Sequence, residues 1–209
     1  MMWGVKWTTA VRHVEELAVK CEELAGGPKS FTPLRVVQLW AAGDLLGAPR
    51  DLDRVTVAVV VDLPVEDVPW LSEPHGAEHW ANATRVSRNP IRALWRSAHA
   101  PVWNHHVDRP ALVWDAADGV AGEALAALAE GRGEQVRLPA PGADEFRARL
   151  RAELAVALRA LRHHTRAYEE KRWAPGKLTA VSDALWRAGE GYLDLLDAVD
   201  RDRPASPLR

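Results

Sequence analysis

One segment restricts the fold of this chain more than any other: residues 55–61 read Val-Thr-Val-Ala-Val-Val-Val. β-Branched side chains are restricted in χ1 and pack well on a pleated surface, so this composition favours an extended strand. The run is almost continuously apolar and does not alternate with polar residues, which is typical of a central strand buried on both faces. We therefore expect the chain to build a sheet around residues 55–61.

A second strand and a helix are predicted upstream of that segment. Residues 34–40 are rich in β-branched and aromatic side chains, which favours another central strand. Before them, apolar residues recur in steps of three and four with charged residues between, as in an amphipathic helix. These apolar residues are Trp7, Val11, Val14, Ala18, Cys21 and Ala25. Gly26-Gly27-Pro28 should end the helix, because glycine accepts a left-handed cap and proline cannot continue the helical hydrogen bonds.

The connection between the two predicted strands, residues 41–53, is where we expect the chemistry. Its glycines and its proline mark a tight connection with an exposed backbone. The connection ends in Asp51-Leu52-Asp53, and two carboxylates spaced in this way point to the same side of a strand. Magnesium is commonly held by one or two carboxylates plus substrate phosphates. The loop therefore predicts a magnesium site beside glycines that let phosphates approach.

This order of helix, strand, glycine-bearing turn and Asp-x-Asp opening a second strand resembles the core pattern of the nucleotidyltransferase (polymerase-beta-like) superfamily. The similarity covers residues 5–62, and residues 44–53 also resemble the loop of tRNA nucleotidyltransferases. The chain further resembles an actinobacterial family within that superfamily. The resemblance implies an α+β fold, a nucleotidyltransferase-like mixed sheet with flanking helices followed by a helical C-terminal lobe. It also implies magnesium as the cofactor, and a nucleotide and an acceptor as partners.

The resemblance assigns roles to individual residues. Gly43 corresponds to the turn glycine, and Asp51 and Asp53 correspond to the metal-binding carboxylates. A third carboxylate is expected on a later strand, and the candidates, with Asp115 preferred, are Asp62, Asp108 and Asp115. Polar side chains gather in residues 103–110, directly before a predicted strand, and Arg109 is the preferred phosphate partner there. The predicted site comprises the catalytic residues Asp51, Asp53 and Asp115 and the nucleotide-binding residues Gly43, Asp44, Gly47 and Arg109.

One departure from the family pattern leaves two functions open. The family carries a small hydroxyl residue beside the turn glycine, whereas this chain carries Asp44, whose carboxylate would repel an incoming triphosphate. The first hypothesis is transfer of a nucleotidyl group from a nucleoside triphosphate to an acceptor with a divalent metal. The second is a catalytically degenerate binding or regulatory module of the same fold.

The second half of the chain predicts a helical lobe. Apolar stripes at helical spacing run through residues 146–168 and 178–199, with a break at Pro175-Gly176, so two antiparallel helices are expected. We place the domain boundary between residues 1–122, the nucleotidyltransferase-like core, and residues 123–209, the helical lobe. Within the core we also predict helices over 77–86 and 90–98 and a strand over 111–114, and just after it a short helix over 123–130.

Composition excludes several other classes. The formal net charge of −2 does not support nucleic-acid binding, which needs a concentrated basic face. We find no run of eighteen apolar residues and no secretory signal, so we expect a cytoplasmic protein without a membrane partner. The single cysteine, Cys21, lies in an apolar helical stripe and is interpreted as a buried hydrophobe. The oligomeric state stays open.

Two further spacings offer alternative sites. His75 and His79 stand four residues apart, as in some zinc sites, although Pro74 and Gly76 favour a loop there. Arg159 and His164 resemble the arginine and histidine of helical ribonucleases that accompany small nucleotidyltransferases. We favour surface or structural histidines for the first pair and a solvated helix face for the second. The ten tryptophans are expected to carry much of the core and of any ligand surface.

Overall fold

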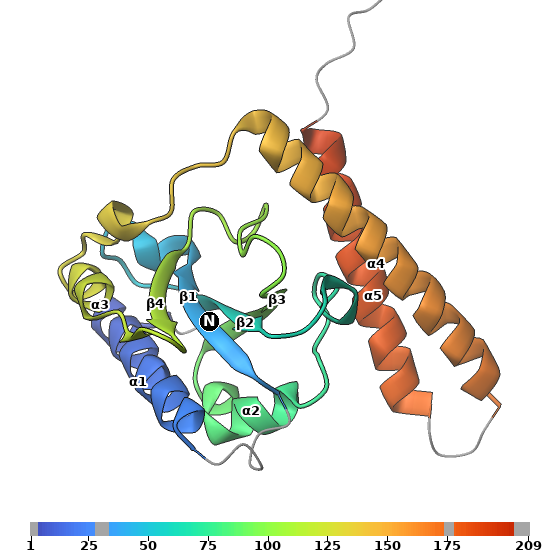
Figure 1. Cartoon of the computed structure of the whole chain (residues 1–209), viewed down its shortest axis with the longest axis horizontal. Coiled ribbons are helices and arrows are strands. Elements are labelled where there is room, and N and C mark those ends of the chain that lie inside the picture. Colours follow the sequence, from blue (N-terminus) through green and yellow to red (C-terminus); the bar gives the residue numbers. More distant parts are fainter. Residues whose placement is uncertain (1–3, 28–33, 174–177, 203–209) are drawn as a thin grey trace, which may run out of the picture. The chain divides into compact units, whose positions relative to one another are not determined.

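The computed structural model describes residues 4–27, 34–173 and 178–202. The chain divides into two compact units (Figure 1). The first comprises Met1–Pro64 and Glu73–Ala140, and the second comprises Val65–Ser72 and Pro141–Arg209. Each unit has its own core.

The first unit is built on one mixed sheet. Its strands are β1 (Val36–Ala42), β2 (Val55–Val61), β3 (Ile91–Ser97), β4 (Ala111–Asp115) and β5 (Gly119–Val120). They are arranged in the order β3-β2-β1-β4-β5, in which β2 and β3 are parallel and the other neighbouring pairs are antiparallel. The α+β class with a mixed sheet is thus confirmed, and β2 lies inside the sheet as its composition predicted.

The predicted adjacency of the first two strands is confirmed. Trp40 lies opposite Ala58, and Ala42 lies opposite Thr56. The connection between β1 and β2 therefore leaves and re-enters the sheet at the same end. The strand predicted over residues 34–40 is shifted by two residues, because β1 extends to Ala42, where the chain turns into a 3₁₀ turn that begins at Gly43.

The helix predicted over residues 90–98 is wrong, because this segment forms β3. All seven residues of β3 pair in register with β2, from Val55 opposite Ile91 to Val61 opposite Ser97. A local pattern does not reveal that β2 would otherwise have an edge without a partner strand. Pairing the backbone N–H and C=O groups of that edge overrides the helical preference of a short segment. The strand predicted over 111–114 is confirmed as β4.

In the described part of the first unit, three α-helices accompany the sheet. α1 (Trp7–Ala25) packs against β1 and β4 through a stripe that includes the fully buried Ala10, Val14 and Ala18. α2 (Ala77–Ala83) ends earlier than the predicted residue 86, since Arg85 adopts a positive φ of 61° and interrupts the helix. α3 (Gly122–Ala129) lies beside α1 (Figure 1) and matches the short helix predicted over 123–130.

The second unit is a helical hairpin of α4 (Ala143–Lys171) and α5 (Leu178–Arg201) (Figure 1). Arg147 near the start of α4 forms an ion pair of 3.1 Å with Asp202 just after α5. The two helices are therefore antiparallel, as predicted. Their buried contact includes Leu150, Ala157 and Leu195. The predicted break at residues 175–176 lies outside the described residues.

The short segment Val65–Ser72 packs against this hairpin. The Nε1 of Trp70 donates a hydrogen bond of 2.6 Å to Asp194 of α5. The backbone of Trp70 lies so close to Gly191 that a Cβ there would overlap it, so the glycine permits the contact. The segment thus belongs to the helical unit, while α3, which begins at Gly122, packs within the sheet unit.

Candidate functional site

The loop between β1 and β2 begins with a glycine that its backbone conformation favours. Gly43 has a φ of +70°, in the left-handed region where a Cβ is strained. The next residue, Asp44, is exposed, and Leu45 and Leu46 are 1% and 0% exposed. Two buried leucines therefore anchor the turn and direct Asp44 into solvent. Gly47 has an extended backbone and donates its N–H to the carbonyl of Asp44 at 3.1 Å.

The carboxylate of Asp44 is paired with a cation from its own loop. Arg50 Nη2 lies 2.9 Å from Asp44 Oδ2, and both side chains are 65% exposed. A pair this open to solvent stabilises the fold by about 0–1 kcal/mol. Its larger consequence is local, because the charge of Arg50 beside the turn is offset by Asp44.

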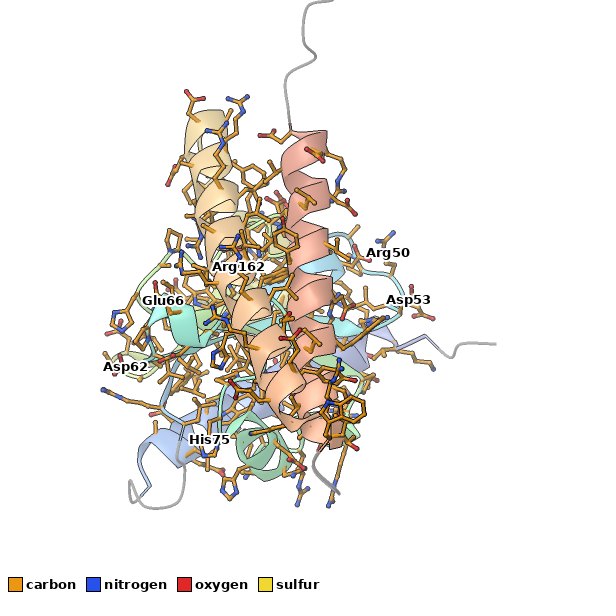
Figure 2. The ribbon with its side chains drawn as sticks, turned by 90° about the vertical axis from the view of Figure 1, so that its right-hand side faces the viewer. Arg50, Asp53, Asp62, Glu66, His75 and Arg162 are labelled. Atoms are coloured by element: carbon orange, nitrogen blue, oxygen red, sulfur yellow. The ribbon has the colours of Figure 1, made fainter. Side chains whose placement is uncertain are left out.

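Asp51 and Asp53 flank a buried residue just before β2. Leu52 is 2% exposed and forms a bridge with Val5, accepting and donating backbone hydrogen bonds of 2.6 and 2.9 Å. Both aspartates are exposed, and Figure 2 shows Asp53 and the neighbouring Arg50 on the same side of the ribbon. The pair precedes the regular strand, which begins at Val55, and does not open it as predicted. Among the described residues, neither carboxylate has a hydrogen-bond or ion-pair partner.

Asp115, the preferred third carboxylate, lies at the opposite end of the sheet. It pairs with Gln38 near the start of β1, whereas the loop follows Ala42 at the end of β1. Four residues of strand separate these positions, about 13 Å. Asp115 therefore does not join Asp51 and Asp53.

The carboxylate of Asp115 is held in place by local donors. It accepts hydrogen bonds of 2.8 Å from the side chain of Gln38 and from the N–H of Ala117. Partial burial by itself would raise the pKa of Asp115, but the hydrogen bonds from Ala117, Gln38 and the N–H of Asp118 outweigh it, so the pKa lies below its usual value. These contacts close the turn between β4 and β5.

The other two candidates for a third carboxylate differ in position. Asp62 follows β2 and pairs with Arg35 at 2.8 Å and with His99 at 3.4 Å. It lies across the ribbon from Asp53 in Figure 2. Asp108 is exposed and precedes β4, whose first residue pairs near the end of β1. By topology, Asp108 is the candidate at the same end of the sheet as the loop.

Arg109, the predicted phosphate partner, is engaged in structural contacts. Its Nη1 lies 2.6 Å from Glu134, and its Nε donates to the carbonyl of Leu138 at 3.2 Å. These bonds fix the segment that follows α3. That segment in turn packs under the loop, because Gly133 lies directly against Leu46. The guanidinium of Arg109 thus stabilises the segment on which the loop packs.

The two alternative spacings belong to different units. His75 precedes α2, which begins at Ala77, so the two histidines do not share a helix face. In the hairpin, Arg159 reaches Glu66 at 3.4 Å. Burial and then the neighbouring charge of His163 lower the pKa of His164.

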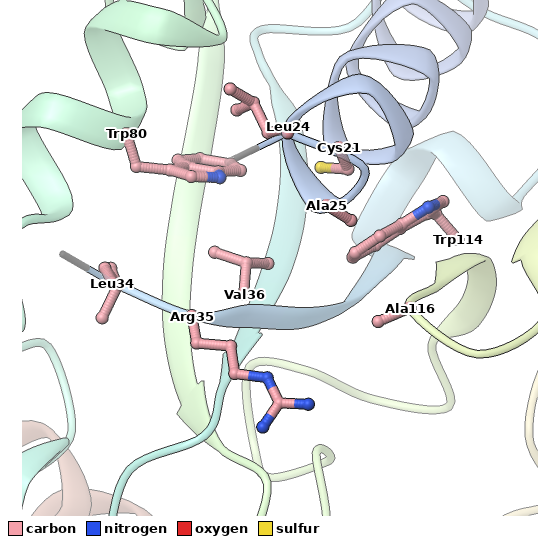
Figure 3. Close-up of a pocket in the computed structure, with 10 residues that line it drawn as sticks. Cys21, Leu24, Ala25, Leu34, Arg35, Val36, Trp80, Trp114 and Ala116 are labelled. Atoms are coloured by element: carbon pink, nitrogen blue, oxygen red, sulfur yellow. The ribbon is translucent and has the colours of Figure 1, made fainter. Parts of the chain in front are cut away.

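Sequence reasoning missed a pocket at the end of the sheet where β1 begins and β4 ends. The pocket has a volume of about 350 Å³ and is bounded by α1, α2, β1 and β4 (Figure 3). Its walls include the indoles of Trp80 and Trp114 and the thiol of Cys21. The abundance of tryptophan was a signal for a ligand surface, but only the fold brings these two rings together. We call this the pocket end, and the end with residues 43–53 the loop end.

The sheet, the hairpin and the loop define an α+β protein with a helical C-terminal part. The chain belongs to the family described as Domain of unknown function (DUF7711), whose profile matches residues 5–201. No curated protein and no solved structure matches the chain. In the described part of the chain, no helix combines the length and the apolar composition that a membrane span requires.

Proposed function

We propose that this chain is a catalytically degenerate nucleotidyltransferase-like protein whose β1–β2 loop serves binding or regulation. The ion pair of Asp44 with Arg50 carries the proposal. It places a carboxylate at the turn where a triphosphate would approach and neutralises the neighbouring arginine. A loop arranged in this way does not favour a polyphosphate.

The order of elements supports the likeness to the superfamily. A helix, a strand, a glycine turn with positive φ, two exposed aspartates and a second strand follow one another, and the two strands are antiparallel neighbours. Function depends on the site as well as on the fold, so this order supports the likeness but not the transfer reaction.

The position of Asp115 supports the loss of catalysis. Metal-assisted transfer requires carboxylates that converge on one place, and Asp115 lies about 13 Å away along β1. The strand beside β2 offers no replacement, because β3 carries Arg92 opposite Thr56 and contains no acidic residue. The loop keeps two carboxylates, Asp51 and Asp53.

A divalent-metal-dependent transferase is the second candidate, and the exposure of Asp51 and Asp53 favours it. Their oxygens are hard ligands without partners among the described residues, and they fit magnesium, which often takes one or two carboxylates with water and phosphate. The metal would supply activation of an acceptor hydroxyl toward the α-phosphate. Asp108 would then replace Asp115 as the third carboxylate.

The test is a calorimetric titration of the full chain with nucleoside triphosphates, with and without magnesium. The degenerate protein should give no magnesium-dependent binding at millimolar nucleotide. Asp44→Ser removes the repelling carboxylate and frees Arg50, so nucleotide affinity should rise at least about tenfold. Asp44→Asn is the matched control, which removes the charge without restoring the small hydroxyl.

Two other results would change the assignment. Magnesium-dependent nucleotide binding by the unchanged protein, abolished in Asp51→Asn and Asp53→Asn, would replace the degenerate module by the active transferase. No binding by any variant, including Asp44→Ser, would remove the nucleotidyltransferase likeness as a guide to function.

A further inference from the structure

The pocket end of the sheet has the size and the walls of a small-molecule site. Its volume of about 350 Å³ lies in the range of ligand sites, about 300–1,000 Å³. Figure 3 shows Trp80 and Trp114 on two sides, with Leu24, Cys21 and Ala25 of α1 between them. Most lining side chains are apolar or aromatic, while polar atoms form nearly as much of the lining surface as apolar ones. The walls therefore favour a flat ring that carries a polar group.

Both tryptophan walls are fixed by the fold. Trp80 is 2% exposed and packs edge-to-face on Trp95 of β3, with ring centroids 5.3 Å apart. Trp114 is 1% exposed, and its Nε1 donates a hydrogen bond of 2.6 Å to Glu22 of α1. A site with rigid walls loses little conformational entropy when it binds.

The two indoles differ in hydrogen bonding. The N–H of Trp114 is satisfied by Glu22, whereas the N–H of Trp80 has no acceptor among the described residues. The nitrogen of Trp80 is not among the buried side-chain nitrogens that lack a partner in the described residues. A ligand acceptor that reached Trp80 would therefore add one hydrogen bond to the complex.

The charges around the pocket favour a neutral ligand. Arg35 lines the pocket, but its guanidinium is paired with Asp62 at 2.8 Å. In Figure 3 it points away from the side chains of Val36 and Trp114. Burial raises the pKa of the Cys21 thiol to about 12, so this wall is also uncharged at neutral pH.

We propose that the pocket bounded by Trp80, Trp114 and Cys21 binds a neutral, planar, largely apolar molecule of one or two fused rings that carries a hydrogen-bond acceptor. The two indoles and the aliphatic side chains of α1 pack on the faces and edges of the ring, and the N–H of Trp80 donates to the acceptor. The site lies at the other end of the sheet from residues 43–53. It is therefore independent of the nucleotide proposal.

Quinoline and naphthalene test this proposal because they have the same shape and only quinoline carries an acceptor. Binding to the full chain is measured by ligand-observed NMR titration at neutral pH, where quinoline is uncharged. We expect quinoline to bind about threefold to tenfold more tightly than naphthalene, as one additional hydrogen bond implies. In Trp80→Phe, which keeps an aromatic wall but lacks the N–H, that preference should disappear.

A second variant keeps the test independent of Trp80. Ala25 is exposed at the end of α1 and lines the pocket, so Ala25→Leu fills the site with little effect on the core. It should weaken both probes at least about fivefold. Trp186→Phe, on the exposed surface of α5, is the matched control and should leave both affinities unchanged. Equal affinity for the two probes, no binding of either, or binding that survives Ala25→Leu would overturn the proposal.

Discussion

The two ends of the sheet differ in what their side chains do. At the loop end, Asp44, Asp51 and Asp53 are exposed, and the only ionic partner given to them by the described residues is Arg50. At the pocket end, Trp80 and Trp114 are buried, and one acidic group, Glu22, is used to satisfy an indole. The same sheet therefore presents exposed charged side chains at one end and a pocket walled by buried tryptophans at the other. Ionic ligands suit the first and neutral rings suit the second.

The largest expected effect is the difference in the free energy of unfolding between a substitution at the pocket end and one at the loop end. Trp114→Ala removes a side chain that is 1% exposed and leaves a cavity beside α1, so we expect a loss of about 3–5 kcal/mol in the free energy of unfolding. Asp53→Ala, at the exposed loop end, should change it by less than about 0.5 kcal/mol. Urea denaturation of both variants measures the difference. Similar losses of stability in the two variants would contradict the contrast between a packed pocket end and a solvent-exposed loop end.

An intermediate effect concerns the support beneath the loop. A Cβ on Gly133 would lie 2.9 Å from the Cα of Leu46 and 3.0 Å from the Cδ2 of Leu128. Gly133→Ala should therefore overpack this contact and cost about 1–3 kcal/mol in urea denaturation. Gly122→Ala is the control, because a Cβ there meets nothing within 4 Å. If the two variants were equally stable, the loop would not be anchored through Gly133.

The smallest effect is the pH dependence of Asp115. Its folded pKa lies below the usual value of 3.8, so it contributes stability that is present above pH 3.8 and is lost as pH falls through the folded pKa. The stability difference between the unchanged protein and Asp115→Asn should thus be largest near neutral pH and shrink below pH 3.8. Urea titrations across pH 2–7 measure it. The same acid-dependent loss in Asp53→Asn would argue against the hydrogen bonds of Asp115 as the cause.

Local periodicity was sufficient to predict much of the fold. The apolar stripe of α1, the β-branched residues of β2 and the two long stripes of the hairpin each bury one surface whose spacing is visible in the chain. The adjacency of β1 and β2 followed from the short connection between them. Segment 91–97 was different, because its strand state depends on pairing with residues 55–61, more than thirty positions earlier.

The candidate site likewise has features that a local pattern predicts and features that depend on strand pairing. The exposure of Asp51 and Asp53 around a buried Leu52 follows from side-chain alternation over three consecutive residues. The sequence carries no strand order by which to choose the third carboxylate. The order β3-β2-β1-β4-β5 with its directions places Asp115 at the far end of β1. Strand direction is a property of pairing across the sheet, so no local pattern could assign it.

The sequence by itself determined the α+β class, the glycine-bearing loop with its two carboxylates and the helical hairpin, because each depends on neighbours within a few residues. The tertiary structure decided which residues share an end of the sheet. It joined Trp80 of α2 to Trp114 of β4 around Cys21, and it separated Asp115 from Asp53. These relations depend on contacts between segments far apart in the chain. Such contacts contribute to stability only after the strands have paired in their final order and register.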